Sequence, residues 1–259
     1  MDDKNEPSDV VNIFDTKYRS ILNDPLCESV ESLSINSSNQ ACILPLLTLL
    51  NIDEAIGKIS NALGWDLIHS NCLKWSGPIF RNLLCKFFNS LLQHNFVPER
   101  MLRGQIRPIV KDLTASKSDS GNYRPVMNSS NLFKVFEYSL LPMLTKHLKL
   151  SNKQFAFRTD TDCVTAVLAM KEVIAKYNAE GSPVHCAMVD LTKAFDKVNY
   201  GKLMRKLKDS TLPKQIVDTL GYMFMNTYVN VQFAGVTSDP WKVGNGTRQG
   251  RVISPLLFS

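Results

Sequence analysis

A short apolar run that ends in a carboxylate is the sequence feature that most restricts the fold of this chain. Residues 183–189 read PVHCAMV, and Gly181 and Asp190 bound the run. A run of this length between turn residues predicts a buried β-strand better than a helix. Asp190 would then lie where the strand leaves the core, hydrated, paired with a cation or bound to a metal, because an unpaired buried charge is strongly unfavourable. In the alternative interpretation, Asp190 or Thr192 only caps a following helix.

The remaining pattern is mainly helical and, with a few strands, predicts an α+β fold. Residues 105–113 alternate apolar and charged side chains, which predicts a strand that Pro108 would confine to a sheet edge. Residues 228–243 alternate and turn at 238–240, which predicts a β-hairpin. Asn51 is expected to cap the first helix. Apolar residues recur at helical spacing in the segments 51–64, 77–96, 132–148, 162–178, 200–208 and 214–225.

The charge of the chain is unevenly distributed. The net charge is +6, but residues 1–40 hold three Lys/Arg and eight Asp/Glu, a net charge of −5, which leaves +11 for residues 41–259. A basic body favours a polyanionic partner such as nucleic acid. Residues 1–50 form an acidic, polar leader that includes the stretch ESLSINSSNQ, and we expect this leader to be flexible.

The cysteines and the apolar runs indicate the compartment. The six cysteines form no CxxC pair and no spacing with histidine that would bind zinc, so we expect reduced thiols in an intracellular protein, nuclear or cytoplasmic. The run ACILPLLTLL is ten residues long and is interrupted by Pro45, which is too short to span a bilayer. We therefore expect no membrane segment. The pattern gives no oligomeric state.

Four motifs in a fixed order carry a family resemblance. In chain order they read RPIVK, NYRPV, VDLTKAFD and TRQGRVISPLLF. This series resembles the reverse transcriptase domain of non-LTR retrotransposons, the LINE and jockey-like elements, from about Asp53 to Ser259. The chain departs from the family pattern at four positions, with Ala156 for Gly, Asp162 for Ser or Thr, Arg248 for Pro and Arg251 for Ser.

The resemblance implies the architecture of a right-hand polymerase. Residues 51–180 would form a fingers-like region that is mostly helical. Residues 181–259 would form a partial palm, in which a small antiparallel sheet packs on helices and which holds the first catalytic motif and the Gln-Gly motif. The thumb would be absent from these residues.

The resemblance also implies a catalytic and metal-binding position. Asp190 would be the catalytic carboxylate and a ligand of two Mg²⁺ ions, together with the backbone carbonyl of Leu191, because hard oxygen ligands suit this cation. The two ions would activate the primer 3′-hydroxyl and hold the triphosphate during nucleotidyl transfer. Asp196 would orient the motif rather than bind metal.

Five further residues would bind the nucleotide by the same resemblance. Lys111 and Arg124 would hold the triphosphate through charge-assisted hydrogen bonds, although either could be a solvated surface charge. Phe195 would lie under the incoming sugar, or else is simply a core aromatic residue. Gln249 and Gly250 would pack on the nascent base pair, or else form an ordinary loop. The scattered basic residues that would contact phosphate are Lys146, Lys149, Lys153 and Arg158.

The implied function is RNA-directed DNA polymerisation with an RNA template, a DNA primer and dNTPs. Polymerases of this family complete the metal site with an aromatic-x-Asp-Asp turn beyond SPLLF, and the adjacent acidic pairs in this sequence are Asp2-Asp3 and Asp53-Glu54, both far upstream. We therefore expect these 259 residues alone not to polymerise DNA. The alternative is a catalytically dead retroelement relic that acts as an RNA-binding or protein-interaction module.

Overall fold

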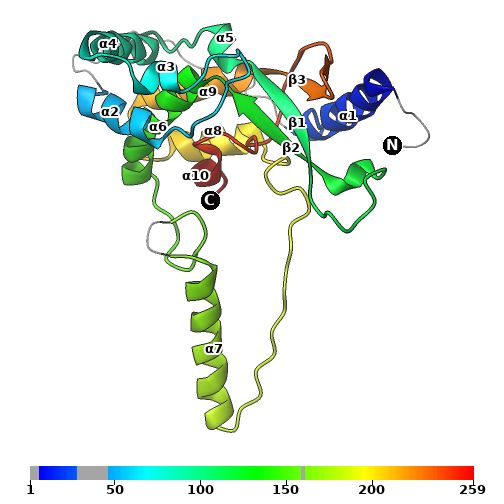
Figure 1. Ribbon diagram of the computed structural model, residues 1–259. Helices are drawn as coiled ribbons and strands as arrows, with labels where there is room; N and C mark the ends of the chain where they lie inside the picture. Colours follow the sequence, from blue (N-terminus) through cyan, green and yellow to red (C-terminus); the bar gives the residue numbers. More distant parts are fainter. Residues whose placement is uncertain (1–5, 28–45, 159–160) are drawn as a thin grey trace. The chain divides into compact units, whose positions relative to one another are not determined.

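The computed structural model describes residues 6–27, 46–158 and 161–259 (Figure 1). They divide into two compact units. The smaller unit comprises residues 149–194 with Ser259, and the larger unit comprises the residues before 149 together with residues 195–258. The chain is mixed in helix and strand, so the predicted α+β class is confirmed. The division into a fingers-like region and a partial palm stays a prediction, and its predicted boundary at 180 does not coincide with the limits of these units.

A small mixed sheet lies in the larger unit. Its strands follow the order β2-β1-β3-β4, with β5 paired to β3. Strands β1 and β2 pair antiparallel, whereas β1 and β3 pair parallel. The sheet is therefore not purely antiparallel as expected. The predicted hairpin is confirmed by the antiparallel pairing of β3 with β4 and β5, but the predicted turn at 238–240 is wrong, because the chain turns at Ala234 and Gly235, which both have positive φ. The strand bounds are β1 Gly104–Val110, β2 Tyr123–Ser129, β3 Tyr228–Phe233, β4 Val236–Thr237 and β5 Trp241–Lys242.

The prediction that Pro108 confines its strand to a sheet edge is wrong, because β1 lies between β2 and β3. Pro108 faces Pro125 across the β1–β2 ladder. Two prolines can face each other only where neither missing N–H would point to the partner strand. The parallel pairing with β3 ends at Ile106, two residues earlier, so the other side of Pro108 needs no donor either.

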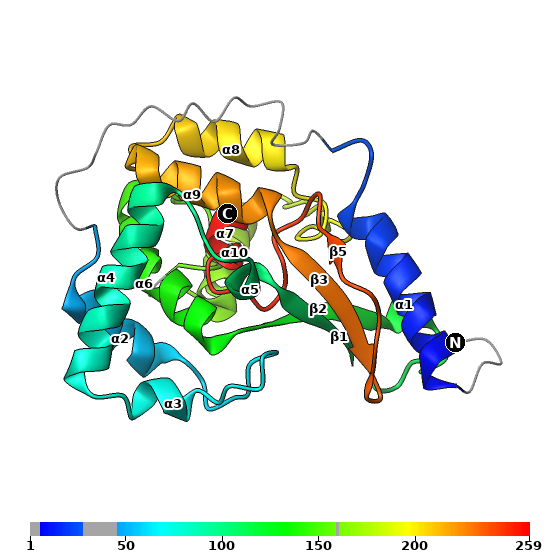
Figure 2. The same cartoon turned by 90° about the horizontal axis from the view of Figure 1, so that it is seen from above.

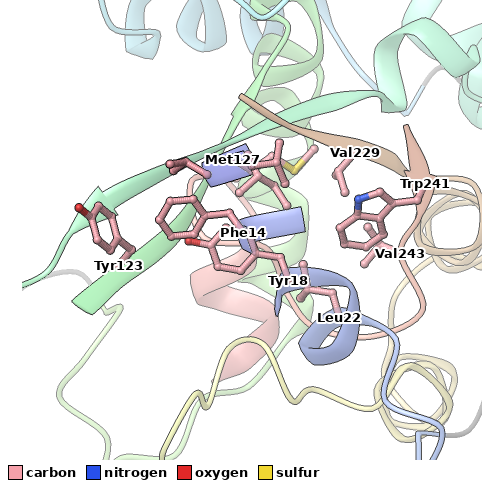
Figure 3. Packing of buried hydrophobic residues seen from close by; sticks show 11 residues of the cluster. Phe14, Tyr18, Leu22, Tyr123, Met127, Val229, Trp241 and Val243 are labelled. Carbon is pink, nitrogen blue, oxygen red and sulfur yellow. The ribbon is translucent and has the colours of Figure 1, made fainter. Parts of the chain in front are cut away.

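The first described helix corrects the expectation of a flexible leader. Helix α1, Pro7–Leu22, buries an apolar stripe that includes Phe14, Tyr18 and Leu22. Figure 3 shows these side chains packed with Met127 of β2 and Val229 of β3. Apolar side chains at a spacing of three to four residues fall on one face of a helix. In this segment the spacing is interrupted by charged residues, so the sequence pattern did not predict a helix. Residues 1–5 and 28–45 of the predicted leader lie outside the described residues.

Polar contacts also join α1 to the hairpin. Asp15 accepts hydrogen bonds from Trp241 Nε1 and Ser238 Oγ, both at 2.8 Å. The ring of Phe14 meets Tyr123 of β2 edge-on, with 5.0 Å between centroids. Aromatic pairs in this geometry contribute about 0.5–1.5 kcal/mol beyond the area they bury. Helix α1 is therefore a structural part of the larger unit.

Most of the remaining predicted helices are confirmed. Thr48, not Asn51, caps α2, because Asn51 is the third helical residue and completes a capping box with Thr48. Helices α2 and α4 pack on each other, α2 packs on α6, and α9 packs on α4 and α8; Figure 2 shows α1 beside the strands, apart from this helical group. The helix bounds are α2 Leu49–Lys58, α3 Asn71–Lys74, α4 Pro78–His94, α5 Glu99–Leu102, α6 Asn131–His147, α7 Cys163–Ala179, α8 Tyr200–Lys208, α9 Lys214–Met225 and α10 Ser254–Phe258.

The smaller unit contains α7 and no strand among its described residues. The predicted strand at 183–189 is wrong, because this segment has no regular structure and Met188 and Val189 are 80% and 87% exposed. No strand of the described sheet pairs with it, and an isolated strand leaves its own backbone groups unpaired. The capping alternative is also wrong, because the next helix is α8 and its cap is Asn199. Asp162 caps α7 by accepting from Thr165 N at 2.8 Å.

Two further observations bear on the sequence expectations. No helix in the described part of the chain combines the length and the apolar character that a membrane crossing requires. The cysteines within the described ranges, Cys27, Cys72, Cys85, Cys163 and Cys186, are free thiols.

Candidate functional site

An exposed basic face forms on the β1–β2 hairpin. Residues opposite each other in an antiparallel ladder point to the same side, and successive residues of a strand alternate sides. Arg124 lies opposite Ile109, so the side chains of Arg107, Lys111 and Arg124 share the face that is turned away from the core. All three basic side chains are exposed. The structure therefore brings together Lys111 and Arg124, which are 13 positions apart in the sequence.

The loop between the two strands is held by its own polar contacts. Lys111 Nζ donates to Gly121 O at 2.8 Å, and Lys111 N donates to Asn122 O at the same distance. The buried Asn122 side chain donates to Asp112 O at 2.7 Å and accepts from Asp112 N at 3.0 Å. Hydrogen bonds from Thr114 lower the pKa of Asp112. These bonds fix the end of the hairpin that carries Lys111.

Arg107 belongs to this face but was not among the predicted site residues. It makes hydrogen bonds to Gln105 Oε1 at 3.2 and 3.4 Å and no ion pair with any described residue. Its place diagonal to Arg124 follows from the strand register, which the sequence alone does not give. The available signal was the alternation of Arg107, Ile109 and Lys111 along one strand.

The turn at Gln249 and Gly250 packs against the outer edge of β2 and forms a backbone hydrogen bond with it. Met127 N donates to Gln249 O at 2.7 Å. Gly250 has φ +100°, and a Cβ built there would lie 2.5 Å from Met127 O. Only glycine accepts both this backbone conformation and this close approach. The two predicted residues Gln249 and Gly250 are thus held directly against β2, the strand that carries Arg124.

Gly246 and Thr247, which lead into the Gln249–Gly250 turn, hold the segment that starts at Phe195. Thr247 N donates to Phe195 O and Gly246 N donates to Val198 O, both at 2.8 Å. Gly246 has φ +87°, and a Cβ there would lie 2.8 Å from Asp196 O. The structure therefore brings Phe195 and Asp196 next to the segment that leads into Gln249 and Gly250.

The predicted side chains of Phe195 and Asp196 have different surroundings. Phe195 is partly buried and stacks on Phe258 with 4.5 Å between ring centroids. Asp196 is buried, and its Oδ1 accepts a long hydrogen bond of 3.4 Å from Gln249 Nε2. These contacts fit an orienting position for Asp196, and the role itself stays a prediction.

Asn245 is a buried residue that the sequence did not single out. Its Nδ2 donates to Ile21 O at 2.9 Å and to Asp196 O at 2.7 Å, while its Oδ1 accepts from Asp24 N at 2.8 Å. One side chain therefore connects the end of α1 to the segment at Asp196. Its sequence neighbours Gly244 and Gly246 indicated only a loop.

The two arginines that depart from the family pattern point into the protein. Arg248 and Arg251 are each 4% exposed. Their charged ends lie in the core beneath the turn. Burial lowers the pKa of Arg248, and burial followed by the nearby charge of Arg248 lowers the pKa of Arg251 to about 10.

Asp190 and Leu191 belong to the smaller unit. Both are exposed in a segment without regular structure. Within the described residues, no three His, Cys, Asp or Glu side chains gather in an arrangement that could hold a metal ion. The described residues therefore supply one candidate carboxylate and no complete set of metal ligands. Lys149 and Lys153 of this unit are exposed, and Arg158 donates to Ser151 O at 2.9 Å.

Comparison with known proteins identifies what the chain resembles. Residues 115–259 match the family model "Reverse transcriptase (RNA-dependent DNA polymerase)". The chain is 23% identical over 172 residues to the "Retrovirus-related Pol polyprotein from type-1 retrotransposable element R2" of Nasonia vitripennis, which covers 66% of the chain and 17% of that protein. It is 25% identical over 215 residues to the "Probable RNA-directed DNA polymerase from transposon X-element" of Drosophila melanogaster, which covers 80% of the chain and 23% of that protein.

A third relative supports the same relationship. The "Probable RNA-directed DNA polymerase from transposon BS" of Drosophila melanogaster is 26% identical over 180 residues, which covers 68% of the chain and 20% of that protein. The chain thus spans about a fifth of the length of the curated relatives that it matches.

Proposed function

The chain belongs to the reverse transcriptase (RNA-dependent DNA polymerase) family, among the enzymes of non-LTR retrotransposons, and we propose that it contributes part of an RNA-directed DNA polymerase. Its partners would be an RNA template, a DNA primer and the incoming dNTP. The observation that carries this proposal is the exposed basic face of the β1–β2 hairpin, which lies on the strand held by the Gln249–Gly250 turn. The intracellular location expected from the cysteines is part of the same proposal.

The basic face is the proposed triphosphate site. Lys111 and Arg124 lie on one face of a paired hairpin, and the bonds of the connecting loop hold the backbone of Lys111. Fixed cationic donors stabilise charge that moves onto the leaving group. Arg107 extends the face along the same strand and would add a contact to the polyanion. Gln249 and Gly250 would pack on the nascent base pair, with Phe195 under the incoming sugar.

Asp190, with the carbonyl of Leu191, is the proposed metal-binding position. The family generally uses a divalent metal, and Mg²⁺ with two ions is our proposal for the complete enzyme. Such a metal would lower the pKa of the attacking hydroxyl and neutralise the phosphates. Asp196, whose backbone carbonyl accepts from Asn245, would orient the motif rather than bind metal.

Nucleotide binding tests the proposal on the chain itself. A preformed RNA–DNA template–primer is mixed with the protein, and the affinity for the complementary dNTP is measured by calorimetry with Mg²⁺ present. Replacing Lys111 and Arg124 together by Gln should weaken dNTP binding by about tenfold or more, because charge-assisted hydrogen bonds are lost. The matched control replaces Lys58 and Lys86, two exposed lysines on α2 and α4, and changes the net charge equally.

The outcome separates the two candidate functions. Equal loss of dNTP binding in the two double variants would overturn the assignment of the basic face. Salt-dependent RNA binding without any dNTP binding would instead support the relic that acts as an RNA-binding module.

A further inference from the structure

Two buried guanidinium groups flank the Gln249–Gly250 turn. Arg248 precedes the turn, and its Nη2 donates to Tyr200 OH of α8 at 2.7 Å. Its guanidinium also lies 5.8 Å from the centre of the Tyr200 ring. Arg251 follows the turn and lies 4.6 Å from the centre of the Phe133 ring of α6. The turn is therefore anchored from both ends by cations that point into the core.

Arg251 and its neighbour Val252 meet one buried carboxylate. Glu137 of α6 is 0% exposed. Its Oε2 accepts from Val252 N at 3.1 Å, and its Oε1 lies 3.9 Å from Arg251 Nε. Arg251 Nη2 also donates to Thr227 Oγ1 at 3.4 Å. Glu137 thus contacts the side chain of Arg251 and the backbone of Val252, the two residues that follow the turn.

The charges in this cluster are not balanced within the described residues. Two guanidinium groups lie beside one carboxylate, and Glu137 is the acidic side chain that acts on both Arg248 and Arg251. Nε and Nη1 of each arginine lack a hydrogen-bond partner among the described residues. Buried charges are tolerated only when paired, so the loss of Glu137 would leave two uncompensated cations under the turn.

The geometry points to Glu137 as a positioning residue for the Gln249–Gly250 turn. Glu137 holds Arg251 and Val252 from below, while Met127 N holds Gln249 O from the side. A turn fixed at both places presents Gln249 in one position above β2. The consequence for dNTP and template binding rests on the proposed function, whereas the positioning of the turn does not.

Amide hydrogen exchange tests the positioning directly. Replacing Glu137 by Gln keeps the size of the side chain and removes its charge, and we expect the amides of Met127 and Val252 to exchange about tenfold faster or more. The amides of the β1–β2 ladder should keep their protection, because that pairing does not involve the turn. Ser139→Ala is the matched control, since Ser139 is buried on the same helix and its hydroxyl donates only to Phe136 O among the described groups. Unchanged exchange at both amides, or equal acceleration in the control, would overturn the inference.

A second variant keeps the test decisive if Glu137→Gln does not fold. Arg251→Met removes one of the two cations and leaves Glu137 with Arg248, so the fold should persist while Val252 and Met127 still exchange faster. Unchanged exchange in this variant would overturn the inference. In the nucleotide-binding assay, both variants should weaken dNTP binding by about tenfold or more, because a displaced Gln249 would lose its contact with the nascent base pair. Faster exchange with unchanged dNTP affinity would retain the positioning of the turn and refute its proposed role in nucleotide binding.

Discussion

Replacing Gly250 by Ala probes the contact that closes the edge of β2. Gly250 has φ +100°, and an added Cβ would lie 2.5 Å from Met127 O and 3.4 Å from Met127 N and C. The contacted atoms belong to the backbone of a paired strand, so no flexible side chain can move aside. We expect the turn to shift away from β2 and to lose the bond from Met127 N to Gln249 O.

Two costs set the magnitude of this destabilisation. An alanine at positive φ costs about 1–2 kcal/mol, and a buried donor that loses its partner costs about 1–3 kcal/mol. We therefore expect Gly250→Ala to lower the free energy of unfolding by about 2–5 kcal/mol. Urea denaturation followed by circular dichroism measures this change, with the m-value checked to show that the surface exposed on unfolding is the same.

Gly57→Ala is the matched control for the same substitution. Gly57 lies in helix α2, and a Cβ there meets nothing within 4 Å. Alanine is favoured over glycine inside a helix by roughly 0.5–1 kcal/mol, so this variant should be slightly more stable. A loss below about 0.5 kcal/mol for Gly250→Ala, the range of an ordinary surface substitution, would refute the reasoning about the turn.

Three further results are expected. Phe14→Ala should lower the free energy of unfolding by about 3–5 kcal/mol in urea denaturation, because the ring is fully buried in the sheet core, whereas Leu26→Ala at an 89% exposed position should leave it within about 0.5 kcal/mol. Burial raises the pKa of Glu137 above its ordinary 4.5, and this effect outweighs the positive charges of Arg251, Arg248 and Lys134, which lower it. Between 4.5 and that raised value the folded protein binds a proton that the unfolded chain has released, so the free energy of unfolding falls as the pH rises, and pH-dependent denaturation of Glu137→Gln should lack this slope. In a polymerase that contains this chain together with the rest of its catalytic domain, Asp190→Ala should abolish Mg²⁺-dependent primer extension, and full activity of this variant would remove Asp190 from the metal site.

Local sequence pattern determined much of the secondary structure. The predicted helices at 200–208 and 214–225 match α8 and α9 as the structure has them. Their apolar spacing and the capping Asn199 act within one or two turns of helix, so they can be read from neighbouring residues. The alternation that predicts a hairpin at 228–243 is also local, although the structure turns at Ala234 and Gly235 and not at 238–240.

The sequence motifs also named residues that the structure places near one another. Phe195, Asp196, Gln249 and Gly250 belong to two motifs more than 50 positions apart, and they meet through the bonds made by residues 245–247 and Gln249. The family resemblance supplied these residues, since no pattern within either segment indicates the other. Their roles in catalysis stay predictions.

Tertiary structure decided what depends on pairing between distant segments. The position of β1 between β2 and β3, the packing of α1 on the sheet and the burial of Arg248 and Arg251 all arise from contacts across the chain. An arginine in a loop is ordinarily exposed, so only the partners Glu137 and Tyr200 show why these two are not. The sequence by itself determined most of the helices beyond residue 48, the pairing of the hairpin strands and the family, because those signals are local or lie in ordered motifs. Strand order, register and the burial of charge were decided by the fold, because they depend on which distant residues satisfy each backbone group and each ion.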